Sequence, residues 1–383
     1  MIANPMDNKR IKIGIIFNFS SSWMGGVNYI INVIKMLNFL DDVKKPELTV
    51  FYNPALKMYI DELNYPYLKS VKWHFPSVFK GYLRSWASGR NVFVNDILSS
   101  YDLDGLYPLH DFPVRTNSKT KLVSWYADLQ HIYYPEFFTK RKVLERTLRI
   151  RFILKNSNDL VVSSNEVAKD FNKFFRIRNN LDVHVFHFAS VIGNISGMSI
   201  EEIRYKYSLP LKYFMVSNQF YKHKNHKVLL QALSILRKKG TKIHFTFTGR
   251  LPEKSNSAYL TELHQLINRN KLHDQISYLG VIPRNEQLLL MKYSQAVIQP
   301  TLFEGWSTVI EDAISLQVPV VASNLPVNIE QLGESGIFFD PYNPIELATI
   351  LDNFPERNFK GIFYEGYTQR LKRAADQFLK IFL

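Results

Sequence analysis

The chain has 383 residues, of which 46% are hydrophobic and 21% are charged, and this balance excludes both a disordered protein and a single small domain. It contains 48 Lys and Arg residues against 34 Asp and Glu residues, and the charge of +14 predicts an anionic partner: a nucleic acid, a phosphorylated small molecule or an anionic membrane surface. The lack of cysteine excludes a disulfide framework, a thiol nucleophile and a cysteine-based zinc site.

The first predicted element is a strand and not a signal peptide. Residues 1–17 are basic and then apolar, but the apolar part is short and runs into Asn18 and a serine cluster. No apolar stretch approaches the ~18–20 residues that a membrane span needs. We therefore expect a cytoplasmic protein that does not cross a membrane.

The first half of the chain has the pattern of a doubly wound α/β domain. Residues 11–17 form a continuous β-branched run, typical of a strand buried on both faces. We expect Gly25 and Gly26 to lie in the loop after it, followed by a helix over 27–40. Further strands are predicted at 48–52, 122–126 and 159–164.

The same pattern restarts near residue 190. Residues 190–199 are small and turn-rich, which is typical of a linker. A helix is predicted over 226–240, where it ends at a glycine. Strands are predicted at 213–217, 242–249, 275–280, 295–300 and 318–323. We expect a domain over 1–190 and another over 191–363, with a final helix over 364–383 packing back on the first.

Two short segments outside the second domain have more than one interpretation. In residues 124–138, Asp128 and His131 lie among aromatic side chains on which a sugar could stack, or they are ordinary satisfied polar residues. Asp102 and Asp104 match a metal-binding Asp-x-Asp pattern, but such short matches occur by chance, and we interpret this one as a turn. No other ligand spacing indicates a metal site.

Basic and aromatic residues are interleaved in 65–86, and residues 140–155 form a basic helix. The plain interpretation of both is a solvated surface. The alternative is docking to an anionic bilayer. Binding of nucleic acid also fits, but we rank it lower because no nucleic-acid motif supports it.

The segment FEGWSTVIEDA, residues 303–313, is the most informative. Thr308 and Glu311 fit a capping box at a helix start, which is the plain interpretation of Glu311. A helix N-terminus also suits a phosphate, and Gly305 lets the backbone approach a ligand. Glu304 would then accept bonds from sugar hydroxyls and Glu311 from a ribose diol. In the same way, Lys224 is either part of a solvated turn or neutralises a diphosphate.

This motif resembles that of the retaining glycosyltransferases of family 4, which have the GT-B fold. Residues 216–225 resemble the family's diphosphate-binding loop, residues 278–283 its nucleobase loop, and Gly25-Gly26 its N-terminal glycine loop. The chain departs from the family twice. Six residues separate the glutamates where seven are usual, which is a known variant, and Gln219 stands where an arginine is usual. Lys222 or Arg250 would have to replace that charge.

The resemblance implies an α/β protein of GT-B fold, with two Rossmann-like domains facing a cleft. It implies retaining, metal-independent and cofactor-free transfer from a nucleotide-diphosphate sugar to a glycan or lipid-linked glycan acceptor, in cell-surface polysaccharide or lipopolysaccharide synthesis. Glu304 would stabilise the transition state, with His131 and Asp128 beside it. The expected donor-binding residues are Glu311, Lys224, Gln219, Gly305, Trp306, Ser307, Thr308, Arg250, Ile282, Gly25 and Gly26.

Two other functions fit the sequence. Gln219 allows a catalytically weak GT-B scaffold or partner protein, and the basic charge allows a protein that binds or modifies nucleic acid. The favoured location is cytoplasmic, on the inner face of a membrane if the anionic surface is used.

Overall fold

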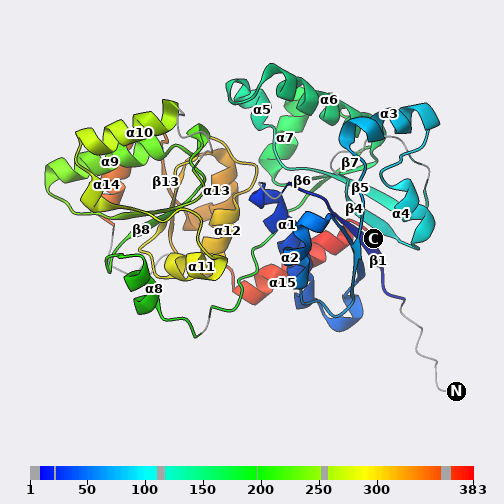
Figure 1. The fold of residues 1–383 in the computed structure, drawn as a ribbon, viewed down its shortest axis with the longest axis horizontal. Helices are drawn as coiled ribbons and strands as arrows, with labels where there is room; N and C mark the ends of the chain where they lie inside the picture. The colour runs from blue at the N-terminus through cyan, green and yellow to red at the C-terminus, as the bar shows by residue number, and fades with distance from the viewer. Residues whose placement is uncertain are drawn as a thin grey trace. The chain divides into compact units, whose positions relative to one another are not determined.

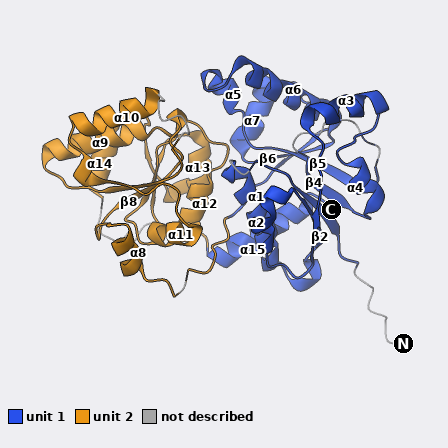
Figure 2. Ribbon diagram, in the orientation of Figure 1, with its two compact units in different colours: residues 1–189, 366–383 blue, residues 190–365 orange. Residues whose placement is uncertain are grey.

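The computed structural model describes residues 9–20, 23–109, 116, 118–195, 197–251, 258–354 and 364–383 (Figure 1). The chain divides into two compact units, shown in Figure 2. Unit 1 consists of Met1–Ala189 with Gly366–Leu383, and unit 2 of Ser190–Glu365. Each unit contains one parallel sheet with helices, which confirms the predicted α/β class.

Unit 1 has a sheet of order β3-β2-β1-β4-β5-β6-β7. Its strands are β1 (Lys12–Phe17), β2 (Glu47–Tyr52), β3 (Leu68–Lys72), β4 (Gly105–Leu109), β5 (Lys121–Tyr126), β6 (Asp159–Val162) and β7 (Asp182–Val185). The runs predicted as strands at 11–17, 48–52, 122–126 and 159–164 are therefore confirmed. Each is a nearly continuous apolar run because a parallel sheet buries both faces.

The helices of unit 1 are α1 (Met24–Met36), α2 (Lys57–Asp61), α3 (Val78–Ser88), α4 (Asn95–Ser100), α5 (Gln130–Tyr133), α6 (Lys140–Asn156), α7 (Asn165–Phe174) and α15 (Tyr367–Lys380). The prediction that Gly25 and Gly26 lie in a loop is wrong, because α1 begins at Met24. Helix α15 packs within unit 1, where Phe378 contacts the rings of Tyr107 and Phe186.

Unit 2 has a sheet of order β10-β9-β8-β11-β12-β13. Its strands are β8 (Phe214–Ser217), β9 (Phe245–Thr248), β10 (Ile276–Tyr278), β11 (Val297–Gln299), β12 (Val320–Ser323) and β13 (Ile337–Phe339). Its helices are α8 (Ile200–Lys206), α9 (His226–Lys239), α10 (Ala258–Arg269), α11 (Arg284–Lys292), α12 (Thr308–Ser315), α13 (Pro326–Leu332) and α14 (Pro344–Asp352). Five of the strands and α9 lie where the sequence predicts them.

The core of unit 2 lies on both faces of its sheet. Phe214 and Val216 of β8 pack in one apolar cluster, whereas Met215 between them packs in another. Neighbouring Val297 and Ile298 of β11 are divided in the same way. Successive side chains of a strand point to opposite faces, so both faces are covered and ligand-binding groups are left to the loops at the strand ends.

Candidate functional site

The candidate site lies in unit 2, at the carboxyl ends of β8 and β11. These strands are neighbours in a parallel sheet, so the segments that follow them start at the same edge. The two segments are also joined directly, since the carbonyl of His223 accepts hydrogen bonds from the Leu302 N–H at 2.7 Å and from Thr301 Oγ1 at 3.2 Å. Residues 78 and 79 positions apart in sequence are thus held side by side.

Lys224 and Glu304 form an ion pair between Lys224 Nζ and Glu304 Oε1. Their side chains are only 18% and 13% exposed. A charge pair that is largely shielded from water interacts more strongly than one on the surface. The same Oε1 also accepts a bond of 2.9 Å from Gln299 Nε2, so the Glu304 carboxylate is held from two directions.

Gln299 orients this carboxylate, and it is not among the site residues predicted from the sequence. Its side chain is fully buried, and its Oε1 accepts a bond of 2.8 Å from Asn218 Nδ2. Its Nε2 therefore faces Glu304 and also donates to Ser307 Oγ at 3.1 Å. The only signal in the sequence was a polar residue at the end of an apolar strand, where a buried parallel strand would normally carry none.

The helix after this loop begins one residue earlier than the predicted cap implies. Ser307 is the N-cap, and its Oγ accepts a bond of 3.3 Å from the Ile310 N–H. Thr308 is thus the first helical residue, and the capping box predicted from Thr308 to Glu311 is wrong. Both hydroxyl residues suit a cap, and the sequence alone did not separate them.

Gln331 of α13 takes the place that the capping box assigned to Glu311. Gln331 Oε1 accepts from the Ser307 N–H at 3.1 Å, and its Nε2 donates to the Ser307 carbonyl and to Glu311 Oε1, each at 2.9 Å. Glu311 is almost fully buried. Gln331 thus fixes both the start of α12 and the second glutamate of the motif.

The loop after β8 approaches the end of β9 very closely. Gly249 has φ +138°, and a Cβ on it would lie 2.3 Å from the carbonyl oxygen of Asn218, so no other residue fits there without a backbone shift. Next to it, the Phe220 N–H donates to the Arg250 carbonyl at 3.2 Å. This brings Arg250 beside Gln219 in the fold. The Arg250 side chain is exposed, as is that of Lys222.

The remaining predicted donor residues of unit 2 lie at the edges of this region. Gly305 and Trp306 stand in the loop before α12, next to Ser307. Ile282 follows β10 and is partly buried against the core. Burial lowers the pKa of His223 to about 3, helped by the charge of Lys224, so this imidazole is neutral at pH 7.

The predicted acceptor residues lie in unit 1. Asp128 Oδ1 accepts a bond of 3.0 Å from the Gln130 N–H at the start of α5. His131 has no exposed surface, and burial, followed by the charge of Arg146, lowers its pKa to about 4. Neither ring nitrogen has a hydrogen-bond partner among the described residues. In this structure His131 is a neutral core residue.

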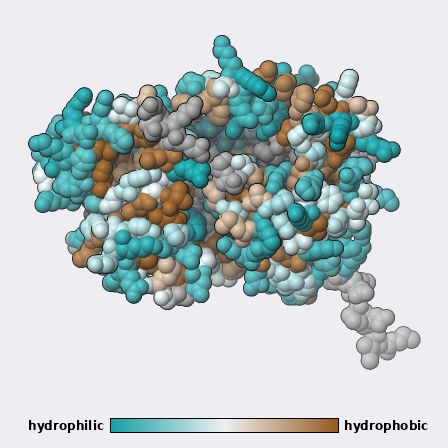
Figure 3. Space-filling view, viewed as in Figure 1, coloured by the Kyte–Doolittle hydropathy of each residue, from teal (hydrophilic) through white to brown (hydrophobic). Residues whose placement is uncertain are grey.

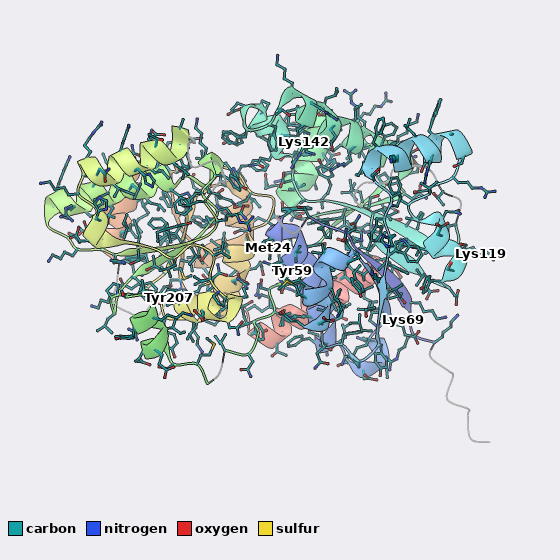
Figure 4. All side chains as sticks on the ribbon, viewed as in Figure 1. Met24, Tyr59, Lys69, Lys119, Lys142 and Tyr207 are labelled. Carbon is teal, nitrogen blue, oxygen red and sulfur yellow. The ribbon has the colours of Figure 1, made fainter. Side chains whose placement is uncertain are left out.

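Gly25 and Gly26 lie in the first turn of α1, beside Trp23. A Cβ on Gly26 would lie 2.8 Å from the Trp23 ring, whereas the nearest atom to a Cβ on Gly25 is at 3.4 Å. The packing of the Trp23 ring therefore explains why position 26 is a glycine. Met24 is the first residue of the helix, and its Sδ accepts a hydrogen bond of 3.6 Å from the hydroxyl of Tyr59 (Figure 4).

Asp102 and Asp104 bind to β1, as expected of a turn. Asp102 Oδ2 lies 2.7 Å from Lys12 Nζ, and Asp104 Oδ2 accepts from the Lys12 N–H at 2.8 Å. Among the described residues there is no group of His, Asp and Glu side chains that could hold a metal ion. In the part of the chain that the structure describes, no helix has the length and apolarity to cross a membrane.

Comparison with known proteins supports a glycosyltransferase domain. Residues 199–375, just under half of the chain, match the family described as "Glycosyl transferases group 1". The O-antigen biosynthesis glycosyltransferase WclY of Escherichia coli is 25% identical over 154 residues, which are 38% of this chain and 40% of that protein. The O-antigen chain mannosyltransferase B of Escherichia coli is 34% identical over 102 residues, 26% of each chain. The matched segments thus span less than half the length of these relatives.

Solved structures of similar fold cover nearly the whole chain. Sucrose-phosphate synthase of Thermosynechococcus elongatus has a TM-score of 0.63 and 14% identity, covering 97% of this chain and 94% of that one. Anabaena HepE in complex with UDP and glucose also has a TM-score of 0.63, with 18% identity, and covers 97% and 96%. These likenesses establish the fold: two Rossmann-like domains of the GT-B type.

Proposed function

We propose, from the premise that residues 199–375 form a glycosyl transferases group 1 domain, that this protein is a retaining glycosyltransferase of the family 4 kind. It would move a sugar from a nucleotide-diphosphate donor to a glycan or lipid-linked glycan. The single observation that carries the proposal is the arrangement of Lys224, Glu304 and Gln299 before the N-terminus of α12.

Lys224 and the start of α12 would hold the donor diphosphate. A helix N-terminus offers free N–H groups and a partial positive charge, and an ammonium group adds a full one. Gly305 would let the backbone approach the phosphates, with Trp306 and Ser307 beside them. Lys224 now pairs with Glu304, and a bound diphosphate would give it a second anionic partner.

Glu311 would hold the ribose of the donor and Ile282 would lie near the base. The fixing of Glu311 by Gln331 supports this role, because a ligand carboxylate must be held in one orientation to bind a diol. Gln219 stands at the place of the family's arginine, and Arg250 is the neighbouring cation whose charge would replace it.

Glu304 would stabilise the positive charge that develops on the sugar as the bond to the diphosphate breaks. Lys224 would stabilise the negative charge on the leaving group at the same time. Gln299 would keep the carboxylate aimed at the sugar. No divalent metal is needed in this scheme, since Lys224 and the helix supply the positive charge, so transfer should survive EDTA.

The acceptor would bind to unit 1 near Asp128, where the buried His131 would act only through its packing, and the product would be a cell-surface polysaccharide. The support is the similarity to two O-antigen enzymes of Escherichia coli. A lipid-linked acceptor would be held at a membrane, so we place the protein in the cytoplasm, on the inner face of a membrane.

The test is a panel of UDP- and GDP-sugars, with release of the nucleotide measured in the presence and absence of EDTA. Release from at least one donor supports the proposal. If every donor stays intact, with or without an acceptor, the second candidate gains: a catalytically weak GT-B scaffold, which Gln219 in place of arginine favours.

A further inference from the structure

Helix α3 carries its large apolar side chains on the outside. Its buried residues are the small Gly81 and Ser85, four positions apart and on one face. A Cβ on Gly81 would lie 2.1 Å from the Phe93 ring, so this face packs directly on the core. By contrast Phe79 is 74% exposed and Trp86 83% exposed, and Val78 and Leu83 are exposed as well. A soluble surface helix has the opposite arrangement.

Helix α6 presents a second exposed apolar stripe next to it. Leu144, Leu148 and Phe152 are exposed and follow each other at intervals of four, which places them on one face of the helix. The two helices meet where the rings of Tyr82 and Phe152 lie 5.4 Å apart. Figure 3 shows hydrophobic residues among hydrophilic ones over this part of unit 1.

The charge of the same two helices is strongly positive. There are two Lys or Arg residues in α3 and seven in α6, against one acidic residue, Glu145. Lys142, labelled in Figure 4, is one of those on the exposed side. Cations beside exposed Trp, Phe and Leu side chains are the combination that binds the interface of an anionic bilayer.

We propose that α3 and α6 form a membrane-docking surface for an anionic lipid bilayer. Phe79, Leu83 and Trp86 would enter the boundary between headgroups and acyl chains, and the Lys and Arg residues would contact the phosphates. A bilayer explains the surface better than a nucleic acid, because nucleic acid would leave the aliphatic Val78, Leu83, Leu144 and Leu148 without a partner. The inference names the surface for the membrane location proposed above, and it does not require the chain to catalyse transfer.

The experiment is co-sedimentation of the full chain with phosphatidylcholine vesicles, with and without phosphatidylglycerol. We expect binding only to the anionic vesicles, weakening with added salt. The triple variant Phe79→Ser, Leu83→Ser, Trp86→Ser should bind at least about tenfold more weakly. The matched control is Tyr205→Ser with Leu211→Ser, which removes two apolar side chains of unit 2 that are 89% and 79% exposed, and should bind as the wild type does.

Two further measurements keep the proposal open to refutation. Trp86 fluorescence should shift to shorter wavelength on anionic vesicles, and Trp86→Phe should lose that change. Nucleotide release from a donor sugar without vesicles should be unchanged in the triple variant, which separates this inference from the proposed transfer activity. Equal binding by triple variant and wild type, or tighter binding to DNA than to anionic vesicles, would overturn the docking surface.

Discussion

At the carboxyl ends of their central strands, unit 2 carries a network of hydrogen-bonded polar side chains around an ion pair, whereas unit 1 carries stacked aromatic rings beside a hydrogen bond between Asn53 and Asn18. In unit 2, Asn218 follows β8 and Gln299 ends β11, and both belong to the network that holds Glu304. In unit 1, Trp125 of β5 stacks on Tyr29 of α1 at 4.3 Å and on Trp23 at 5.7 Å.

This difference shows that one sheet plan allows either polar or aromatic packing at the strand ends. Both units place helices on a parallel sheet, so the backbone does not decide what is bound. Fixed polar groups beside an ion pair suit a charged ligand such as a diphosphate, whereas Trp125 and Tyr29 are each only 2% exposed and belong to the core of unit 1. The proposed function places the donor on unit 2, where single substitutions can test it.

The largest effect is expected from Glu304→Gln in unit 2. The change removes the charge that faces the developing cation, so nucleotide release from the donor should fall by about 10²–10³-fold. Nucleotide affinity should be kept or increased, because Lys224 loses a competing anion. Steady-state kinetics and calorimetry measure the two effects. Glu334→Gln, at an exposed acid of the same unit, is the control, and equal rates for the two variants would remove Glu304 from the mechanism.

Gln299→Leu tests whether the polar network of unit 2 is used for orientation. Leucine cannot donate to Glu304 and leaves the Asn218 amide without its acceptor. We expect kcat to fall by about 10–100-fold with little change in KM for the donor, and stability to fall by about 1–3 kcal/mol. A variant that is destabilised yet keeps the wild-type kcat would show that Gln299 is a core residue only.

The stability of the protein should fall in acid because His131 is buried in unit 1 as a neutral imidazole. Its pKa is about 4 in the folded chain and about 6.5 when unfolded, so the unfolded state takes up the proton first as the pH falls. Stability is therefore full above pH 6.5 and is lost between 6.5 and 4, by about 2 kcal/mol at pH 5. Urea unfolding measures this effect. Between pH 7 and 5 the free energy of unfolding should fall by about 2 kcal/mol less in His131→Leu than in the wild type. An identical pH dependence in both chains would mean that the imidazole is hydrated.

Substitutions of the adjacent Gly25 and Gly26 test the aromatic packing of unit 1. Gly26→Ala must displace the Trp23 ring from its stack and should destabilise the protein by about 1–2 kcal/mol. Gly25→Ala finds more room in the same helical turn and should be neutral or stabilising by about 0.5 kcal/mol. Thermal unfolding measures both. Should Gly25→Ala instead weaken nucleotide binding without changing stability, the glycines would serve a phosphate as the family resemblance implies.

The central strands could be predicted because a strand that is buried on both faces needs apolar residues at successive positions. The prediction includes the edge strand β10 but lacks the edge strands β3 and β7, in which polar residues interrupt the apolar ones, and β13, whose apolar run Ile337–Phe339 is only three residues long. In β3, Lys69, Ser70 and Lys72 are exposed, and the segment was assigned to a stretch of surface with basic and aromatic residues. An edge strand is fixed by pairing with its neighbour, here β2, and that pairing has no local sequence signal.

The site was partly predictable for a related reason. Glu304, Glu311 and Lys224 belong to a motif with recognisable order and spacing. Gln299 and Gln331 are single polar residues whose partners lie on other elements, so only the fold brings them to the glutamates. The start of α12 was misplaced by one residue because serine and threonine are adjacent there and both can cap.

The most direct test of the account is calorimetric binding of UDP and GDP to the full chain. The wild type should bind at least one of them. Lys224→Ala and Glu311→Ala should each weaken that binding by about tenfold or more, since each removes a contact involving a charged group. Lys227→Ala, which removes only a surface ion pair with Glu262, should bind as the wild type does. Failure of the wild type to bind either nucleotide, or equal affinity in all four proteins, would contradict the assignment of the donor to unit 2.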